Sequence, residues 1–253
     1  MRYVAIGDSY TEGVGDELED GSVRGWADMV AAGLAVSTGE QVHYANLAIR
    51  GRLLEPIATE QCDAALSLDP APDLMTVDGG GNDMLRPGWD MSRMMDLTRR
   101  MVDRAGDAGV RIVILTGAAP SLQMPRAELM LGRARDFTDL VIDYVADLPH
   151  ASVIDNLTDQ EMRRPGYWAP DRLHLNALGH SRVAARVLTH LGHETPLPSL
   201  DVPDPSGMSL VGELRYARQY VLPWIGRRLT GRSSGDGRVP KHADWSPVPA
   251  GTD

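Results

Sequence analysis

The chain has 253 residues, a length that suits one α/β domain with or without an appendage, and a formal net charge of −10. Apolar residues make up 43% and charged residues 24%, which argues against wholesale disorder. The acidic balance gives no electrostatic reason to expect a nucleic-acid partner, because a phosphate backbone is bound by clustered Lys and Arg.

Strand-like and helix-like segments alternate along the first three-quarters of the chain. Short apolar and β-branched runs predict strands at 2–7, 42–48, 74–78, 110–116 and 151–154. Apolar residues at helical spacing predict helices at 26–36, 55–68, 92–108, 126–147 and 176–191. This alternation is typical of a parallel sheet with helices on both faces. We therefore predict an α/β fold for residues 1–192, a three-layer α/β/α sandwich with a roughly five-stranded parallel sheet.

The chain after Gly192 has a different composition. A Pro-, Asp- and Ser-rich stretch from about residue 196 predicts a linker, an amphipathic segment follows at 210–229, and 232–253 look loosely structured. We predict that this C-terminal extension, 193–253, packs its apolar stripe on the preceding domain or on a second subunit, as in a homo-oligomer. A membrane-surface helix is the alternative, against which Glu213 and Pro223 weigh.

The cysteine content and the N-terminus predict the compartment. Cys62 is the only cysteine, so no intramolecular disulfide can form and a thiolate metal site is disfavoured. Asp8 and Ser9 come too early for a secretory signal, and no apolar run approaches the ~18 residues of a membrane-spanning helix. We therefore expect a cytoplasmic protein with no stable membrane insertion, and neither a metal nor a cofactor.

A serine directly follows the first predicted strand. In the sequence Gly7-Asp8-Ser9-Tyr10, Ser9 lies at the carboxyl end of the sheet, where ligands bind in folds of this kind. Serine is a weak nucleophile unless a base takes its proton. The alternative is that Ser9 only caps a helix.

Asp171 and His174 offer such a base near the last predicted helix. A carboxylate three residues from an imidazole can hold its tautomer and stabilise the imidazolium that forms during the reaction. An isolated pair at this spacing is more often an ordinary surface Asp and His. The other histidines lack this setting, and we interpret them as structural or solvated.

Attack on a carbonyl builds negative charge on its oxygen, which must meet preorganised donors. Asn82 follows the glycine run after the third predicted strand and offers a side-chain amide. Gly51 follows the second strand and can bring a backbone N–H close, since it has no Cβ. Each glycine alone usually means only a tight turn. Apolar pocket walls are predicted nearby, with ordinary loop packing as the alternative for each, at Met84, Leu85, Trp89, Leu122 and Trp168.

These four segments, in this order, are similar to the conserved blocks of the GDSL/SGNH hydrolases. The resemblance runs from Arg2 to about Gly192, and the first block reads GDSY rather than GDSL. It implies the flavodoxin-like SGNH hydrolase fold, with Ser9 as nucleophile, His174 as general base and Asp171 as its orienting carboxylate. It further implies an oxyanion hole made by the backbone N–H groups of Ser9 and Gly51 and by the Asn82 side chain.

The resemblance implies serine-dependent hydrolysis of a small-molecule carboxylic ester through an acyl-enzyme intermediate. Thioesters, lysophospholipids and acetylated sugars stay open as substrates. One alternative is a non-catalytic binding or scaffolding protein with the same fold, and the intact Ser9, Asn82, Asp171 and His174 argue against it. Another is a metal-dependent phosphoesterase, which is disfavoured because no His residues accompany the Asp residues at ligand-like spacing.

Overall fold

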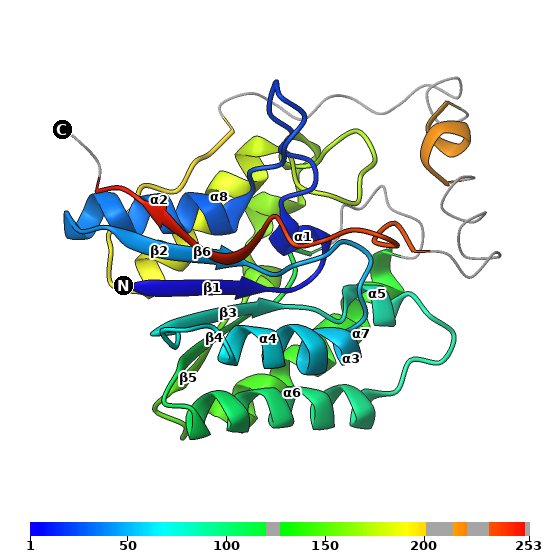
Figure 1. The fold of residues 1–253 in the computed structure, drawn as a ribbon. Helices are drawn as coiled ribbons and strands as arrows, with labels where there is room; N and C mark the ends of the chain where they lie inside the picture. Colours follow the sequence, from blue (N-terminus) through cyan, green and yellow to red (C-terminus); the bar gives the residue numbers. More distant parts are fainter. Residues whose placement is uncertain (120–126, 201–214, 222–232, 251–253) are drawn as a thin grey trace.

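A six-stranded sheet with the strand order β5-β4-β3-β1-β2-β6 forms the centre of the protein. The computed structural model describes residues 1–119, 127–200, 215–221 and 233–250 (Figure 1). The first five strands are parallel to their neighbours, and β6 runs antiparallel to β2 at the edge. Their bounds are β1 Arg2–Ile6, β2 Val42–Asn46, β3 Leu74–Asp78, β4 Arg111–Leu115, β5 Ala151–Ile154 and β6 His242–Val248.

Helices cover both faces of the sheet. The helices α2 (Trp26–Thr38) and α8 (Ala177–His190) lie on one face (Figure 1). On the other face lie α3 Leu54–Pro56, α4 Cys62–Leu66, α5 Gly81–Met84, α6 Met91–Asp107 and α7 Ala127–Val145. The remaining helical segments of the described chain are α1 Ser9–Glu12 and the single turns η1 Ile57–Gln61, η2 Asn156–Thr158, η3 Gln160–Arg163, η4 Pro165–Tyr167 and η5 Ala217–Val221.

The apolar core is divided into two layers by the sheet. Successive side chains of a strand point to opposite faces, so Tyr3 packs toward α2 and α8 while Val4 packs toward α4, α6 and α7. All five residues of β3 are buried, as expected for a central parallel strand covered on both sides. The three-layer α/β/α sandwich predicted from the sequence is confirmed.

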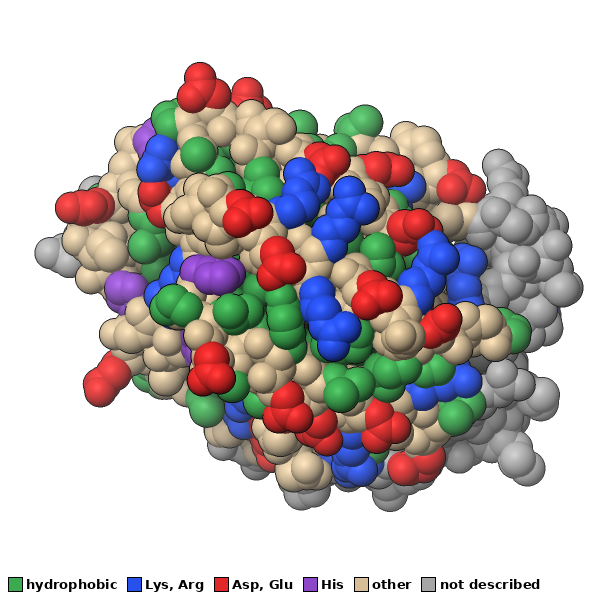
Figure 2. All heavy atoms as spheres, turned by 90° about the horizontal axis from the view of Figure 1, so that it is seen from below, with side chains coloured by type: hydrophobic (Ala, Val, Ile, Leu, Met, Phe, Trp, Pro, Cys, Tyr) green, Lys and Arg blue, Asp and Glu red, His purple; other side chains and the backbone are tan. Residues whose placement is uncertain are grey.

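The outer surface of the helices on the second face carries many charged side chains. Figure 2 shows acidic and basic side chains interspersed on this side of the molecule. Ion pairs on the surface of α6 include Arg93 with Glu55 at 2.7 Å and Arg99 with Asp96 at 3.4 Å. These helices therefore bury one side against the sheet and leave the other to water.

The C-terminal segment differs from our prediction. We expected 232–253 to be loosely structured, but β6 pairs with β2, with Val248 opposite Val42 and Ser246 opposite Tyr44. The proline at position 247 argues against a strand, yet an edge strand tolerates proline because one side of its backbone needs no ladder partner. Of the amphipathic segment predicted at 210–229, only 215–221 lies within the described residues.

The parallel strands bring distant parts of the sequence to one edge of the sheet. The segments that follow β1, β2, β3 and β4 all leave the sheet at its carboxyl edge, since these strands share one direction. Ser9, Gly51, Asn82 and Thr116 belong to these four segments. The fold thus gathers the predicted site residues although 73 sequence positions separate Ser9 from Asn82.

Candidate active site

Ser9 begins α1 after a tight turn from β1. The turn requires Gly7, because a Cβ there would lie 2.6 Å from Thr11 Oγ1 and 2.7 Å from the carbonyl oxygen of Asp78. The side chain of Gln61 holds the turn: its Oε1 accepts from Gly7 N–H at 2.7 Å and its Nε2 donates to Gly7 O at 3.0 Å. The buried N–H and carbonyl groups of Gly7 therefore both have hydrogen-bond partners. These bonds hold the turn in place and so fix the position of Ser9, two residues further along the chain.

Ser9, Asn82 and His174 line one pocket at the carboxyl edge of the sheet. The prediction from sequence places these three side chains in a common site, and the fold brings them there from α1, α5 and the segment before α8. The pocket continues inward between β3, β4 and α7, where its walls include Val77, Ile114 and Phe137.

His174 is oriented by Asp171. Its Nδ1 lies 2.6 Å from Asp171 Oδ2, while Asp171 Oδ1 accepts from the backbone N–H groups of Leu173 and His174 at 3.0 Å each. Burial raises the pKa of Asp171, but the hydrogen bond and charge of His174 outweigh burial, so this pKa lies below its usual value. An ionised Asp171 keeps the proton of the imidazole on Nδ1, which leaves Nε2 as an acceptor.

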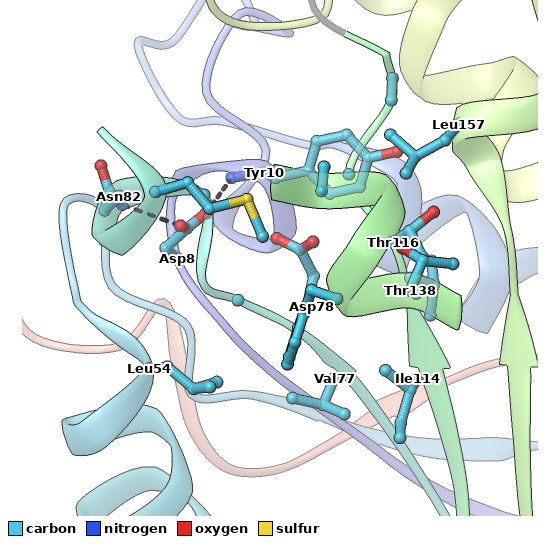
Figure 3. A pocket seen from close by; sticks show the side chains of 18 of the residues that line it. Asp8, Tyr10, Leu54, Val77, Asp78, Asn82, Ile114, Thr116, Thr138 and Leu157 are labelled. Carbon is cyan, nitrogen blue, oxygen red and sulfur yellow. Dashed lines mark hydrogen bonds between the residues drawn. The ribbon is translucent and has the colours of Figure 1, made fainter. Parts of the chain in front are cut away.

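Asn82 is tied to the segment that carries Ser9. Its Nδ2 donates to Asp8 Oδ2 at 2.8 Å (Figure 3) and also to the carbonyl oxygen of Arg52 at 3.0 Å. Asp8 also accepts from Tyr10 N–H through Oδ1 at 3.1 Å. An amide group has two hydrogens, so both are occupied here, and an oxyanion at Asn82 has to compete with one of these acceptors.

Gly51 lies in the loop after β2, but it does not belong to the described lining of the pocket. Its φ of 75° is in the left-handed region, and a Cβ there would lie 2.4 Å from Ser233 Oγ. The loop is linked to α5, because Leu54 N–H donates to Asp83 Oδ2 at 2.9 Å. The role of Gly51 in an oxyanion hole stays a prediction.

The predicted pocket walls are found in part. Met84, Leu85 and Trp168 line the pocket. Trp89 does not: its ring packs edge-on against Phe137, with centroids 6.3 Å apart, and it belongs to the core beneath the sheet. The place of Trp89 in the pocket wall stays a prediction, because Trp89 packs against the lining residue Phe137 and is not itself among the described lining residues. Leu122 lies outside the described residues.

Several residues of the site had no signal in the sequence. Glu12 Oε1 accepts from Arg50 Nε at 2.8 Å, and its Oε2 accepts from Arg50 N–H at 2.6 Å, which joins α1 to the loop of Gly51. Asp78, the last residue of β3, is only 6% exposed and lines the pocket. The Glu12–Arg50 contact and the position of Asp78 in the pocket both depend on segments far apart in the chain. No pattern in a single sequence predicts such contacts.

The C-terminal segments contact the loops that carry the site. Tyr216 OH donates to the carbonyl oxygen of Asp171 at 3.1 Å, and the guanidinium of Arg172 lies 3.8 Å from the centroid of the Tyr216 ring. Lys241 Nζ donates to the carbonyl oxygen of Glu12 at 2.7 Å. Residues beyond position 192 therefore support both the segment of Ser9 and the segment of His174.

The described parts of the chain hold neither a cluster of metal-ligand side chains nor a helix able to span a membrane. No group of three or more His, Cys, Asp or Glu side chains there is arranged to hold a metal ion. Within the same residues, every helix is too short or too polar to cross a bilayer.

The protein resembles known ester hydrolases in sequence and in fold. A family model described as the GDSL-like lipase/acylhydrolase family matches residues 5–182. No curated protein matches the chain. Among solved structures, the lipase Lip_vut3 from a goat rumen metagenome is 20% identical, with a TM-score of 0.63 over 77% of this chain and 98% of that one.

Two further structures share the fold. A mutant of Axe2, an acetyl-xylooligosaccharide esterase from Geobacillus, is 18% identical, with a TM-score of 0.62 over 76% of this chain and 94% of that one. The psychrotrophic esterase EstA from Pseudoalteromonas is 17% identical, with a TM-score of 0.57 over 76% of this chain and 96% of that one. At these identities the structures establish the fold, while the family model covers well over half of the sequence. The chain therefore belongs to the GDSL-like lipase/acylhydrolase family.

Proposed function

We propose that Ser9 is the nucleophile, His174 the general base and Asp171 the orienting carboxylate of a serine ester hydrolase. The observation that carries the proposal is the 2.6 Å contact between His174 Nδ1 and Asp171 Oδ2, made by a histidine that lines the same pocket as Ser9. Membership of the family supports the reaction class, hydrolysis of a carboxylic ester, and leaves its substrate open.

The reaction proceeds in two halves. Ser9 Oγ attacks the ester carbonyl carbon and gives its proton to His174 Nε2, and the charge of Asp171 stabilises the resulting imidazolium. The tetrahedral intermediate collapses as His174 returns the proton to the departing alcohol, which leaves an acyl group on Ser9. Water then attacks the acyl-enzyme with His174 as base, and the carboxylic acid is released.

The oxyanion is stabilised by the backbone N–H groups of Ser9 and Gly51 and by the Asn82 amide. The support for the Asn82 role is its place beside Ser9 in the lining of one pocket, and one of its two amide hydrogens, now donated to Asp8 or to the Arg52 carbonyl, would turn to the oxyanion. Preorganised donors of this kind act most strongly where water is excluded, as in a pocket with apolar walls.

The apolar walls favour an ester with at least one group large enough to fill the pocket. A lipase and an acetyl-xylooligosaccharide esterase share this fold, so deacetylase, thioesterase and lysophospholipase activities on the same site stay alternatives. A non-catalytic binding protein is the alternative outside this class. A cytoplasmic location, the absence of a nucleic-acid partner, a homo-oligomer formed through the C-terminal extension and the domain boundary at 192/193 also stay predictions.

The test is loss of both turnover and covalent labelling in Ser9→Ala. We expect the unaltered protein to hydrolyse short-chain p-nitrophenyl esters and to gain one phosphonate adduct from a fluorophosphonate probe, located on Ser9 by peptide mass spectrometry. Ser37→Ala is the matched control, because Ser37 is exposed in α2 and remote from the pocket. Undiminished hydrolysis or labelling in folded Ser9→Ala contradicts the assignment.

A further inference from the structure

Asp78 places a buried carboxyl group inside the pocket. It is the last residue of β3 and is 6% exposed. Figure 3 shows its carboxyl group pointing into the cavity, with Asp8 and Asn82 on one side and Thr116 on the other. The reaction derived above makes no use of this group, so its presence in the pocket needs a separate explanation.

Within the part of the chain that the structure describes, Asp78 has no partner that stabilises a charge. Among the described residues, no hydrogen bond to its carboxyl group and no nearby cation contributes to its pKa. Burial raises the pKa of Asp78 well above its usual value, and the charge of Asp8 raises it further. A buried polar group without a partner costs stability, and an apolar side chain here would avoid that cost.

Asp8 differs from Asp78 in its hydrogen bonds. Burial raises the pKa of Asp8 to about 6, against hydrogen bonds from Tyr10 N–H and Asn82 that favour its ionised form. Two neighbouring buried carboxyl groups do not both ionise readily, so the charge of the pair resides on the one with donors. Asp78 therefore keeps its proton near neutral pH, and a neutral carboxyl group offers one O–H donor and one carbonyl acceptor.

Other hydroxyl groups lie around this carboxyl group. Tyr10 and Thr116 both line the pocket, and each is held from behind by Asn156: its side chain lies 3.5 Å from Tyr10 OH, and its N–H donates to Thr116 Oγ1 at 2.7 Å. The walls beside them, Ile114 and Phe137, are apolar. Away from the Ser9 site, the lining thus sets Asp78 and a few hydroxyl groups, those of Thr98 and Thr138 included, among apolar walls that suit hydrocarbon.

We propose that Asp78 makes the site selective for esters whose pocket-bound group carries a hydroxyl. Such a hydroxyl donates to the carbonyl oxygen of the carboxyl group and accepts from its O–H, so both partners are satisfied when water leaves. A plain alkyl group would remove water from the carboxyl group of Asp78 without replacing the hydrogen bonds that the water had made. An ammonium group would require Asp78 to ionise beside Asp8 between apolar walls, which the surroundings disfavour. The inference rests on the proposed function of the Ser9 site.

The test compares matched substrates within each variant. One pair differs in the acyl group, p-nitrophenyl butanoate and p-nitrophenyl 3-hydroxybutanoate, and the other in the alcohol, butyl acetate and 4-hydroxybutyl acetate. We expect the unaltered enzyme to favour the hydroxylated member of at least one pair by about tenfold or more in kcat/KM. Asp78→Leu should reverse that preference, and Asp78→Asn, whose amide both donates and accepts, should retain most of it.

A ratio of two substrates on the same sample does not depend on the fraction of folded protein. Asp139→Asn, an exposed position on α7, is the matched control and should leave the ratio unchanged. Equal kcat/KM within both pairs, or a preference that persists in Asp78→Leu, overturns the inference while the proposed function stands. Failure of the unaltered enzyme to hydrolyse any of the four esters overturns the proposed function instead.

Discussion

Replacing Asp171 by Asn removes one charge and leaves the shape of the side chain unchanged. Asp171 Oδ1 accepts from two backbone N–H groups, those of Leu173 and His174, and Oδ2 faces His174 Nδ1 at 2.6 Å. The Asn side chain has only one oxygen, and this oxygen accepts from the backbone N–H groups of Leu173 and His174. The NH2 group must then face Nδ1, which forces the imidazole into the tautomer with its proton on Nε2.

A histidine in that tautomer cannot accept the proton of Ser9. We therefore expect Asp171→Asn to lower kcat by about 10³- to 10⁴-fold, the size of effect known for a base held in the wrong tautomer. KM for a short p-nitrophenyl ester should change little, because Asp171 is not among the described residues that line the pocket. The assay is steady-state hydrolysis at several pH values, with circular dichroism as a check on folding.

Two controls separate this explanation from general damage to the loop. Asp136→Asn makes the same chemical change at an exposed position of α7 and should keep full activity. Asp171→Ala removes the carboxylate without imposing a tautomer, so it should be no slower than Asp171→Asn. A kcat of Asp171→Asn within tenfold of the unaltered enzyme would refute the reasoning.

Asn82, His180 and the C-terminal segment each offer a further test. Asn82→Ala should lower kcat by about 10²- to 10³-fold with a smaller change in KM, and an unchanged kcat in single-turnover assays would remove Asn82 from the oxyanion hole. Burial lowers the pKa of His180 from 6.5 to about 4. Between these two pH values His180 is therefore protonated in the unfolded chain and neutral in the folded protein. The free energy of unfolding should therefore fall by about 3 kcal/mol as pH drops through this window, and urea titrations of His180→Gln should show a weaker dependence unless the reasoning is wrong. Truncation after Gly192 removes β6 and the contact of Lys241 with Glu12, so it should lower the melting temperature, and a truncated protein of equal stability would contradict the packing described for β6.

Local chemistry made much of this protein predictable from its sequence. The alternation of β1, β3 and β4 with helices was predictable because buried parallel strands require continuous apolar runs. Asp171 and His174 were predictable as a candidate pair because residues three apart in one turn lie within reach of a hydrogen bond. The position of Ser9 followed from a strand that ends in glycine, since Gly7 alone fits beneath Asp78 O and Thr11.

Contacts between distant segments were decided only by the tertiary structure. The strand β6 has a sequence with Asp244 and Pro247, and it becomes a strand because the free edge of β2 offers backbone partners. Trp89 packs edge-on against Phe137 of α7 and is not among the described residues that line the pocket, and only the approach of α7 decides this. Asp78 reads in the sequence as the end of a strand, and only its burial in the pocket and the approach of Asp8 raise its pKa and favour a neutral carboxyl group there. Patterns along a chain report neighbours a few residues apart, whereas burial and charge in a site depend on residues that the fold brings from elsewhere.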